Sequence, residues 1–169
     1  LNLPKPRRID EAVPANLTSG IRHDVDGVLL MQPRPVAAAH QGSYAGDVSP
    51  QLAWQWVQAG EAVLVDVRSD AEREWVGFVP GAVPVAWKQW PGMGMNPRFD
   101  DAVREAAEGG HKLVLLCRSG VRSIAAAKRA TELGLEAYNI LEGFEGDPDA
   151  QAQRGHKGGW RHHGLPWRQ

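Results

Sequence analysis

Cysteine is almost absent from this chain, and several other features are missing with it. Cys117 is the only cysteine among 169 residues, so no disulfide can form within the chain. The formal net charge is −1, which gives no sign of a surface that binds nucleic acid. No apolar run approaches the roughly 20 residues that are needed to span a bilayer. We therefore expect a soluble globular protein that engages neither nucleic acid nor a membrane.

The chain does contain enough apolar sequence for one folded domain. Hydrophobic residues make up 43% of its 169 residues, which is sufficient for one well-buried core. A single cysteine suits a reducing compartment, so we expect a cytoplasmic protein, with the periplasm and an organelle as alternatives. The chain begins at Leu1 rather than at a methionine, which leaves open the removal of a targeting segment.

Residues 1–46 differ in composition from the rest of the chain. They carry prolines at positions 4, 6, 14, 33 and 35 and scattered charges, without a regular hydrophobic period. We expect an extended N-terminal arm that lies on the domain or on a second copy of the chain, where it would support a homodimer. Partial disorder is the alternative. The folded domain is then expected over residues 47–169.

From Ser49 onward, helical and strand patterns alternate. Ser49 followed by Pro50 is typical of a helix start. Strands are expected at residues 62–65, 82–86, 113–116 and 137–141, and further helices at 69–75, 99–107 and 123–133. This alternation predicts an α/β fold with a parallel sheet and helices on both faces. Ligands of such sheets bind at the carboxyl ends of the strands, where Asp66 and Cys117 fall.

Cys117 stands where an apolar strand gives way to a short loop and a helix. Backbone N–H groups of the loop, the positive end of the helix dipole and the guanidinium groups of Arg118 and Arg122 would all favour a thiolate there. A lone cysteine is more often a small buried hydrophobe. Such a residue, however, has no need of an Arg-Ser-Gly loop and a helix start directly after it. We therefore interpret Cys117 as a nucleophile that accepts an atom or an anion.

Four short motifs follow one another in an order that is typical of a known family. They are Leu64–Arg68, Val79–Ala82, Cys117–Ser123, and Leu141–Phe144 with Trp160 and Gly164–Pro166. Together they resemble the single-domain rhodaneses, and the resemblance extends over residues 47–167. It implies a rhodanese-like fold and a sulfurtransferase that moves sulfane sulfur from a donor such as thiosulfate to a thiol, sulfite or cyanide.

The resemblance also implies roles for residues near the cysteine. Cys117 would form a persulfide as the covalent intermediate, with no cofactor and no metal. Backbone N–H groups of the loop would cradle the persulfide, and the Arg118 side chain would contact the anionic donor. These groups belong to Arg118, Ser119, Gly120, Val121 and Arg122. The Arg122 side chain either binds the donor or anchors the loop to an acidic residue.

Asp66 and Arg68 are implied to support this loop rather than to take part in the chemistry. The resemblance places them in hydrogen bonds or ion pairs with a glutamate such as Glu72 or Glu74.

Two other classes of function compete with this interpretation. Phosphatases and arsenate reductases also use a cysteine in an anion-binding loop that an arginine closes, but their loops are one residue longer than the four residues between Cys117 and Arg122. This loop also lacks an aspartate that could protonate a leaving group. The second competitor is a non-catalytic rhodanese module that serves only in binding. Such modules usually lose the cysteine, which this chain keeps.

The chain departs from the family pattern in three places. Phe78 stands where many members carry a histidine, so we infer that this histidine is dispensable here. The stretch 87–99 is longer than usual, and its Trp90, Met93 and Met95 either form an apolar rim that selects the acceptor or pack in the ordinary way. We favour packing. The polar stretch 145–159 is expected to form a surface loop.

Three histidines near the C-terminus raise the question of a metal. No cysteine or paired carboxylate completes a tetrahedral set with His156, His162 and His163, so we expect no metal site. We expect the tail 160–167 to pack against the domain instead.

Overall fold

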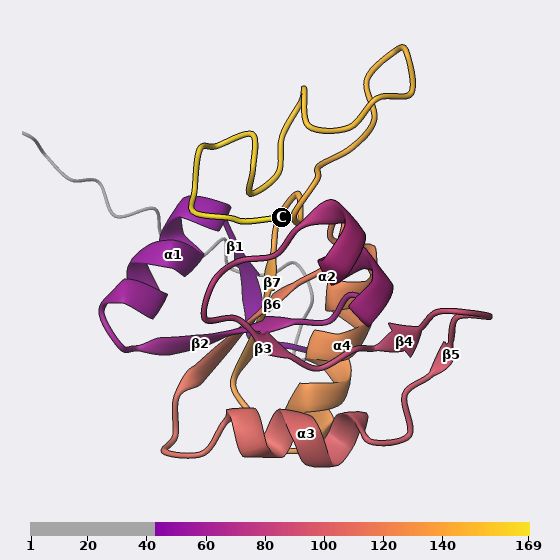
Figure 1. Ribbon diagram of the computed structural model, residues 1–169. Helices are drawn as coiled ribbons and strands as arrows, with labels where there is room; N and C mark the ends of the chain where they lie inside the picture. Colours follow the sequence, from indigo (N-terminus) through magenta and orange to yellow (C-terminus); the bar gives the residue numbers. More distant parts are fainter. Residues whose placement is uncertain (1–42) are drawn as a thin grey trace, which may run out of the picture. The chain divides into compact units, whose positions relative to one another are not determined.

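The computed structural model describes residues 43–169 (Figure 1). Its main sheet has the order β1-β7-β6-β2-β3, and all neighbouring strands are parallel. The strands are β1 (Gly46–Val48), β2 (Ala62–Asp66), β3 (Val83–Pro84), β6 (Lys112–Leu116) and β7 (Ala137–Ile140). The helices are α1 (Pro50–Gln58), α2 (Asp70–Val76), α3 (Phe99–Ala106) and α4 (Val121–Glu132). The predicted parallel α/β fold is confirmed.

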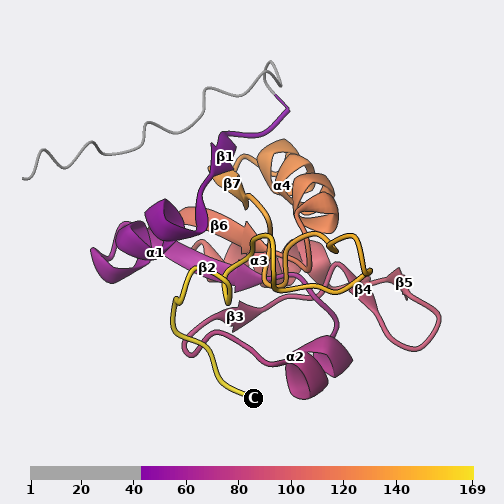
Figure 2. The same ribbon diagram turned by 90° about the horizontal axis from the view of Figure 1, so that it is seen from above.

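Alternating side chains of the central strands produce two cores, one on each face of the sheet. Leu113 and Leu115 of β6 pack with residues of α3 and α4, whereas Val114 and Leu116 point to the opposite face, where α1 lies. Seen from above, α1 lies on one side of the sheet and α4 on the other (Figure 2). Burial on both faces explains why these strands read as continuous apolar runs. Between residues 43 and 169 no helix combines the length and the apolar character that crossing a membrane requires.

The helix starts follow from their capping residues. The Ser49 side chain accepts a hydrogen bond from the backbone N–H of Leu52, and Pro50 occupies the first turn of α1. At the start of α2, Ser69 and Glu72 form a capping box, in which each side chain accepts from the other residue's backbone N–H. Both caps satisfy amide donors that would otherwise lack a partner in the first turn.

The structure adds elements that the sequence pattern did not reveal. Strand β1 pairs with β7 and occupies Gly46–Val48, at the predicted junction between arm and domain. The arm is predicted over residues 1–46, and residues 1–42 of it lie outside the described residues. The arm therefore stays a prediction. A small antiparallel hairpin of β4 (Lys88–Gln89) and β5 (Gly94–Met95) fills part of the stretch 87–99. Strands this short carry too few residues to show a period.

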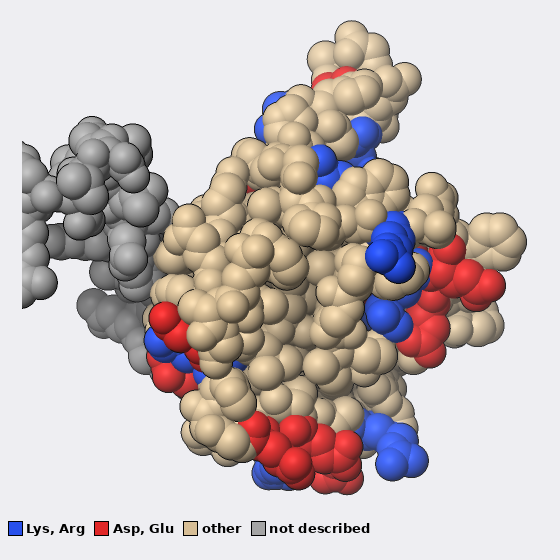
Figure 3. Space-filling view, turned by 60° about the vertical axis from the view of Figure 1, so that its left-hand side comes forward, with Lys and Arg blue, Asp and Glu red and all other residues tan. Residues whose placement is uncertain are grey.

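Charged side chains of both signs are spread over the surface. On the face shown in Figure 3, acidic side chains gather in small groups, and basic side chains lie next to them. This mixture agrees with the net charge of −1 for the whole chain.

The C-terminal segment after β7 packs on the domain, although it has little regular secondary structure. The Trp160 ring is fully buried, meets Trp54 of α1 edge-on at 5.8 Å, and donates its indole N–H to the Pro166 carbonyl at 2.8 Å. A backbone bridge joins Phe78 to Arg168. The expectation that the tail 160–167 packs against the domain is confirmed for Trp160, while Trp167 is 39% exposed.

A buried ion pair lies at the carboxyl end of β2, whose last residue is Asp66. Asp66 and Arg68 are both 0% exposed, and the Arg68 guanidinium donates to the Asp66 carboxylate at 2.7 and 3.0 Å. Arg68 also donates to the Gly77 carbonyl at 2.8 Å and lies over the Phe144 ring at 4.1 Å. The pair therefore links β2, the end of α2 and the C-terminal segment.

Removing one partner of this pair should be strongly destabilising. We expect Arg68→Ala to lower the free energy of unfolding by about 3–5 kcal/mol. The buried Asp66 carboxylate would keep only the backbone N–H of residue 68 and the longer contact with Arg73 at 3.5 Å. Denaturant-induced unfolding measures this difference. Arg104→Ala is the matched control, since Arg104 forms only an exposed pair with Asp101 at 3.9 Å. It should cost about 1 kcal/mol or less, and equal losses in the two variants would contradict the assigned importance of the buried pair.

Candidate active site

Cys117 lies at the carboxyl end of β6, and α4 begins four residues later at Val121. The loop turns back on itself at Gly120, which caps α4 with a φ of 101°, a conformation that glycine adopts readily. This turn directs the Gly120 N–H at the Cys117 sulfur, 3.1 Å away. Such a donor, together with the N-terminus of a 12-residue helix, stabilises negative charge on the sulfur. Cys117 is only 1% exposed, so its sulfur lies beneath the loop.

A chain of polar side chains continues from the cysteine into the sheet. The Ser123 hydroxyl lies 3.1 Å from the Cys117 sulfur and donates to the Asn139 side-chain carbonyl at 2.6 Å. The Asn139 amide in turn donates to the Asp47 carboxylate at 2.9 Å. Because a carboxylate only accepts hydrogen bonds, Asp47 orients the Asn139 side chain with its NH₂ group toward Asp47 and its carbonyl oxygen toward Ser123. That oxygen in turn orients the Ser123 hydroxyl, which donates to it. Ser123 and Asn139 thereby hold the sulfur in place.

Sequence reasoning missed Ser123, Asn139 and Asp47 as parts of the site. The signal that could have drawn attention to them is an asparagine inside an otherwise apolar strand, because a buried amide needs partners. The identity of those partners depends on α4 and β1 lying next to β7, which no local pattern shows.

The turn after β7 holds the loop from the other side. Backbone N–H groups of Phe144 and Glu145 donate to the carbonyls of Cys117 and Arg118 at 2.8 and 2.9 Å. Directly before Phe144, Gly143 approaches the loop so closely that a Cβ atom would lie 2.5 Å from the Arg118 carbonyl carbon. Its φ of 66° is a second reason for glycine at this position. The turn that contains Gly143 and Phe144 of the predicted tail motif therefore holds the Cys117 loop in place.

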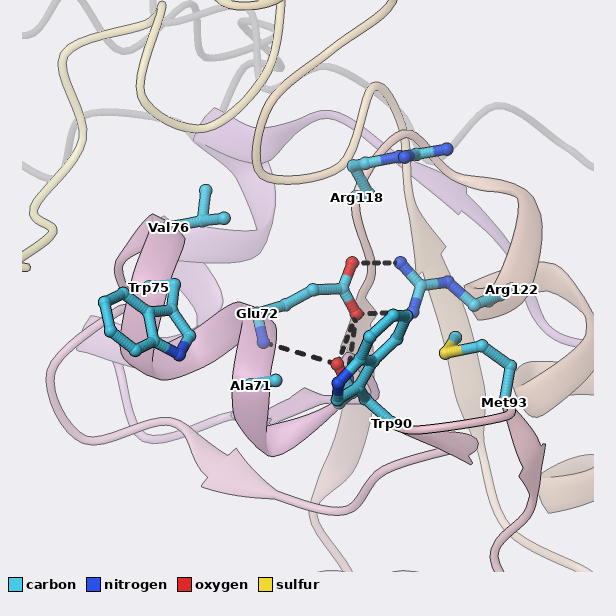
Figure 4. Close-up of a pocket in the computed structure, with 9 residues that line it drawn as sticks. Ala71, Glu72, Trp75, Val76, Trp90, Met93, Arg118 and Arg122 are labelled. Atoms are coloured by element: carbon cyan, nitrogen blue, oxygen red, sulfur yellow. Dashed lines mark hydrogen bonds and ion pairs between the residues drawn. The ribbon is translucent and has the colours of Figure 1, made fainter.

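Arg122 anchors the loop to α2. Its guanidinium donates to both carboxylate oxygens of Glu72, at 2.6 and 2.7 Å (Figure 4). Burial raises the pKa of Glu72, but the hydrogen bonds from Arg122 and Ser69 outweigh burial and lower it to about 2. The same contact with Glu72 raises the pKa of Arg122. Of the two orientations left open for Arg122, the structure has the one that ties the loop to an acidic residue.

The partner expected for Arg68 needs correction. Arg68 binds Asp66, two residues before it, and neither residue forms the expected contact with Glu72 or Glu74. The physical reason is the capping box: Glu72 already accepts from Ser69, which turns its carboxylate toward Arg122.

Arg118 differs from Arg122 in having a free side chain. Within residues 43–169 no hydrogen bond or ion pair forms at its guanidinium, which is exposed and points away from Glu72 (Figure 4). A cation without a partner beside Cys117 is available to an anionic ligand. Ser119 lines a different pocket, together with Ser49 and Leu141, and Val121 is exposed.

A cavity of about 420 Å³ opens beside the loop. Its lining residues come from the Cys117 loop, from the first turn of α4, from α2 with its cap, and from the turn between β4 and β5 (Figure 4). They are Ser69, Ala71, Glu72, Trp75, Val76, Trp90, Met93, Arg118 and Arg122. The packing interpretation of the stretch 87–99 therefore holds only in part. Trp87 packs against Phe99, whereas Trp90 is 67% exposed and Met93 lines the cavity.

Each of the C-terminal histidines has its own polar partner, and the rings of His162 and His163 also meet edge-on at 5.4 Å. His156 contacts Asp149 and His163 contacts Glu142, each at 2.6 Å, while His162 faces the Gly155 carbonyl at 3.1 Å. Among residues 43–169 no group of three or more histidine, cysteine, aspartate or glutamate residues is placed to hold a metal ion.

Comparison with known proteins decides the family. The model of the rhodanese-like domain matches residues 49–147. The chain belongs to this family. The match extends from the cap of α1 to just past the turn after β7, so it includes the Cys117 loop and, except for Asp47, the residues that hold it.

Three relatives illustrate the similarity of this rhodanese-like domain to known proteins. The crystal structure of Rv0390 from M. tuberculosis has a TM-score of 0.68 and 44% identity, and the match covers 75% of this chain and 98% of that one. An uncharacterized protein of Rickettsia conorii is 34% identical over 111 residues, which are 63% of this chain and 82% of that protein. The thiosulfate sulfurtransferase GlpE of Actinobacillus succinogenes is 28% identical over 121 residues, covering 71% and 87%.

The Glu72–Arg122 contact should make the rhodanese-like domain sensitive to acid. Because the pKa of folded Glu72 is about 2 and its ordinary value is 4.5, the carboxylate stabilises the fold above pH 4.5. This stabilisation, about 2–3 kcal/mol, is lost as the pH falls from 4.5 toward 2. We expect Glu72→Gln to lack this part of the pH dependence, measured as the free energy of unfolding between pH 6 and pH 3.

Glu74→Gln is the control for this measurement, because Glu74 is an exposed residue of the same helix. It should follow the wild-type pH profile. A Glu72→Gln profile that also follows the wild type would show that the contact does not set the acid sensitivity.

Proposed function

We propose that this rhodanese-like protein is a sulfurtransferase that carries sulfane sulfur on Cys117. The single observation that carries the proposal is the Gly120 N–H, 3.1 Å from the Cys117 sulfur at the start of α4. Donors in this position stabilise both the attacking thiolate and the persulfide that it becomes. The similarity to a thiosulfate sulfurtransferase supports the same chemistry.

The first half-reaction loads the cysteine. The Cys117 thiolate attacks the outer sulfur of thiosulfate, and a bond forms between the two sulfur atoms. The S–S bond of thiosulfate breaks, and its electron pair leaves on sulfite. In the second half-reaction a thiolate, sulfite or cyanide attacks the outer sulfur of the persulfide, and the electron pair returns to Cys117. No oxidant, reductant, metal or other cofactor is consumed in either step.

Electrostatics divides the two arginines between different tasks. The Arg122 charge is compensated by Glu72, so it maintains the shape of the loop. The Arg118 charge has no such partner and is left to attract the anionic donor. Asp66 and Arg68 support the site indirectly. Arg68 lies over the Phe144 ring, and the Phe144 backbone N–H donates to the Cys117 carbonyl.

A phosphatase or arsenate reductase is less well supported by this geometry. In such enzymes the loop arginine grips the oxyanion, whereas the guanidinium of Arg122 is occupied by both oxygens of Glu72. A purely binding rhodanese module would have no use for a sulfur that Gly120 and Ser123 both contact at 3.1 Å.

Mass spectrometry of the intact protein after incubation with thiosulfate tests the persulfide directly. We expect a gain of one sulfur atom that cyanide removes, and no gain in Cys117→Ser, because only the thiolate can attack. A phosphate-ester hydrolysis assay is run beside it. Ester hydrolysis without a gain in mass would replace the sulfurtransferase with a phosphatase.

A second variant tests the assignment of Arg118. We expect Arg118→Ala to raise the KM for thiosulfate roughly fivefold, as the loss of one exposed charge contact implies. The KM for a neutral alkyl persulfide donor should change much less. Arg98→Ala, which removes another exposed arginine, is the control in the same steady-state assay. Equal effects of Arg118→Ala on both donors would remove Arg118 as the anion contact.

A further inference from the structure

The cavity beside the Cys117 loop is larger than a small inorganic donor requires. Its volume is about 420 Å³, which lies in the range of sites for organic ligands. Thiosulfate has five non-hydrogen atoms and fills at most about 150 Å³, even if each atom is given the volume share of a water molecule, roughly 30 Å³. More than half of the cavity is therefore left for another molecule.

The lining of the cavity is mostly apolar. Trp75 and Val76 of α2 lie on one side of it and Met93 on the other, with the Trp90 ring between them (Figure 4). Trp75 is 74% exposed and Trp90 is 67% exposed, so the faces of both rings are available. Exposed aromatic rings that gather at a cavity are typical of binding sites, because covering them releases water from apolar surface.

One positive charge remains in this apolar surface. The charged lining residues are Glu72, Arg118 and Arg122. Glu72 and Arg122 neutralise each other through two hydrogen bonds. Arg118 is the residual charge. A complementary ligand thus has an apolar body that lies on the rings and an anionic group that reaches Arg118.

We propose that this cavity selects the sulfur acceptor, and that the acceptor is a small thiol with an aromatic or branched apolar body and a carboxylate. The inference rests on the proposed function, because it concerns the second half-reaction. The acceptor thiolate attacks the outer sulfur of the Cys117 persulfide, and a new S–S bond forms. The bond to Cys117 breaks, its electron pair stays on Cys117, and the product is an organic persulfide.

The specificity residues are Trp90 and Met93, together with Trp75. They contact the body of the acceptor rather than the reacting sulfur, so they decide which acceptor is used. Met95 offers a control on the same hairpin, because it is 52% exposed but does not line the cavity.

Three acceptors separate the contributions of the ring and of the charge. The compounds 2-mercapto-3-phenylpropanoate and 2-mercaptopropanoate differ only by the phenyl ring, and 2-phenylethanethiol lacks the carboxylate. With thiosulfate as the donor, we expect kcat/KM to be roughly tenfold higher for the phenyl carboxylate than for either of the other two thiols. Cyanide is included as an acceptor that uses neither feature.

Variants then connect each preference to its residue. Trp90→Ala should abolish most of the preference for the phenyl ring, and Arg118→Ala most of the preference for the carboxylate. Met95→Ala should leave both preferences as in the wild type. These are ratios of kcat/KM within one variant, so a change in the loading step cancels.

The outcomes distinguish the two proposals. Transfer to cyanide with equal use of the three thiols would overturn the acceptor assignment and leave the sulfurtransferase intact. The acceptor assignment would also be overturned, and the sulfurtransferase would stand, if Met95→Ala changed the preferences as much as Trp90→Ala does. That result is expected if the whole apolar surface of the hairpin docks a larger partner. Absence of transfer to every acceptor, cyanide included, would overturn both.

Discussion

The close approach between Gly143 and the Cys117 loop is the contact on which the site depends. The backbone of the loop can lie against the turn after β7 only because no Cβ intervenes, and the loop carbonyls then find donors at Phe144 and Glu145. With its carbonyls held outward in this way, the loop presents a backbone N–H to the sulfur. The absence of a side chain at Gly143, 26 residues further along the chain, thus shapes the surroundings of the Cys117 sulfur.

The polar groups around this loop form three supports with different chemistry. The buried Asp66–Arg68 pair links β2 to Phe144, the Glu72–Arg122 pair ties the loop to α2, and Ser123 with Asn139 holds the sulfur from the sheet side. In each case a partner within the protein compensates the charge or dipole, although Nη1 of Arg68 is buried without a hydrogen-bond partner in the part of the chain that the structure describes. Arg118 is the exception, and its uncompensated charge is what a substrate can recognise.

Much of the fold follows from local sequence. The central strands β2 and β6 each contain a continuous apolar run of four residues. The caps Ser49 and Ser69 set the starts of two helices through hydrogen bonds from backbone N–H groups three residues ahead. The position of Cys117 at a strand end followed by a helix is local information too, and it was predicted. The β4–β5 hairpin and β1 were missed, because two or three residues show no period and their pairing partners are distant or exposed.

The sequence by itself determined the parallel α/β fold, the family and the position of Cys117 between a strand and a helix, since each can be recognised from short motifs of residues that are neighbours along the chain. Tertiary structure decided which arginine is free. Arg118 and Arg122 are four residues apart and look equivalent in the sequence, yet Glu72 lies 50 residues away and neutralises only one of them. It also decided that Trp87 is packed in the core and Trp90 is exposed at the cavity. A charge or an aromatic ring gains its role from what packs against it, and that is settled only when distant segments meet.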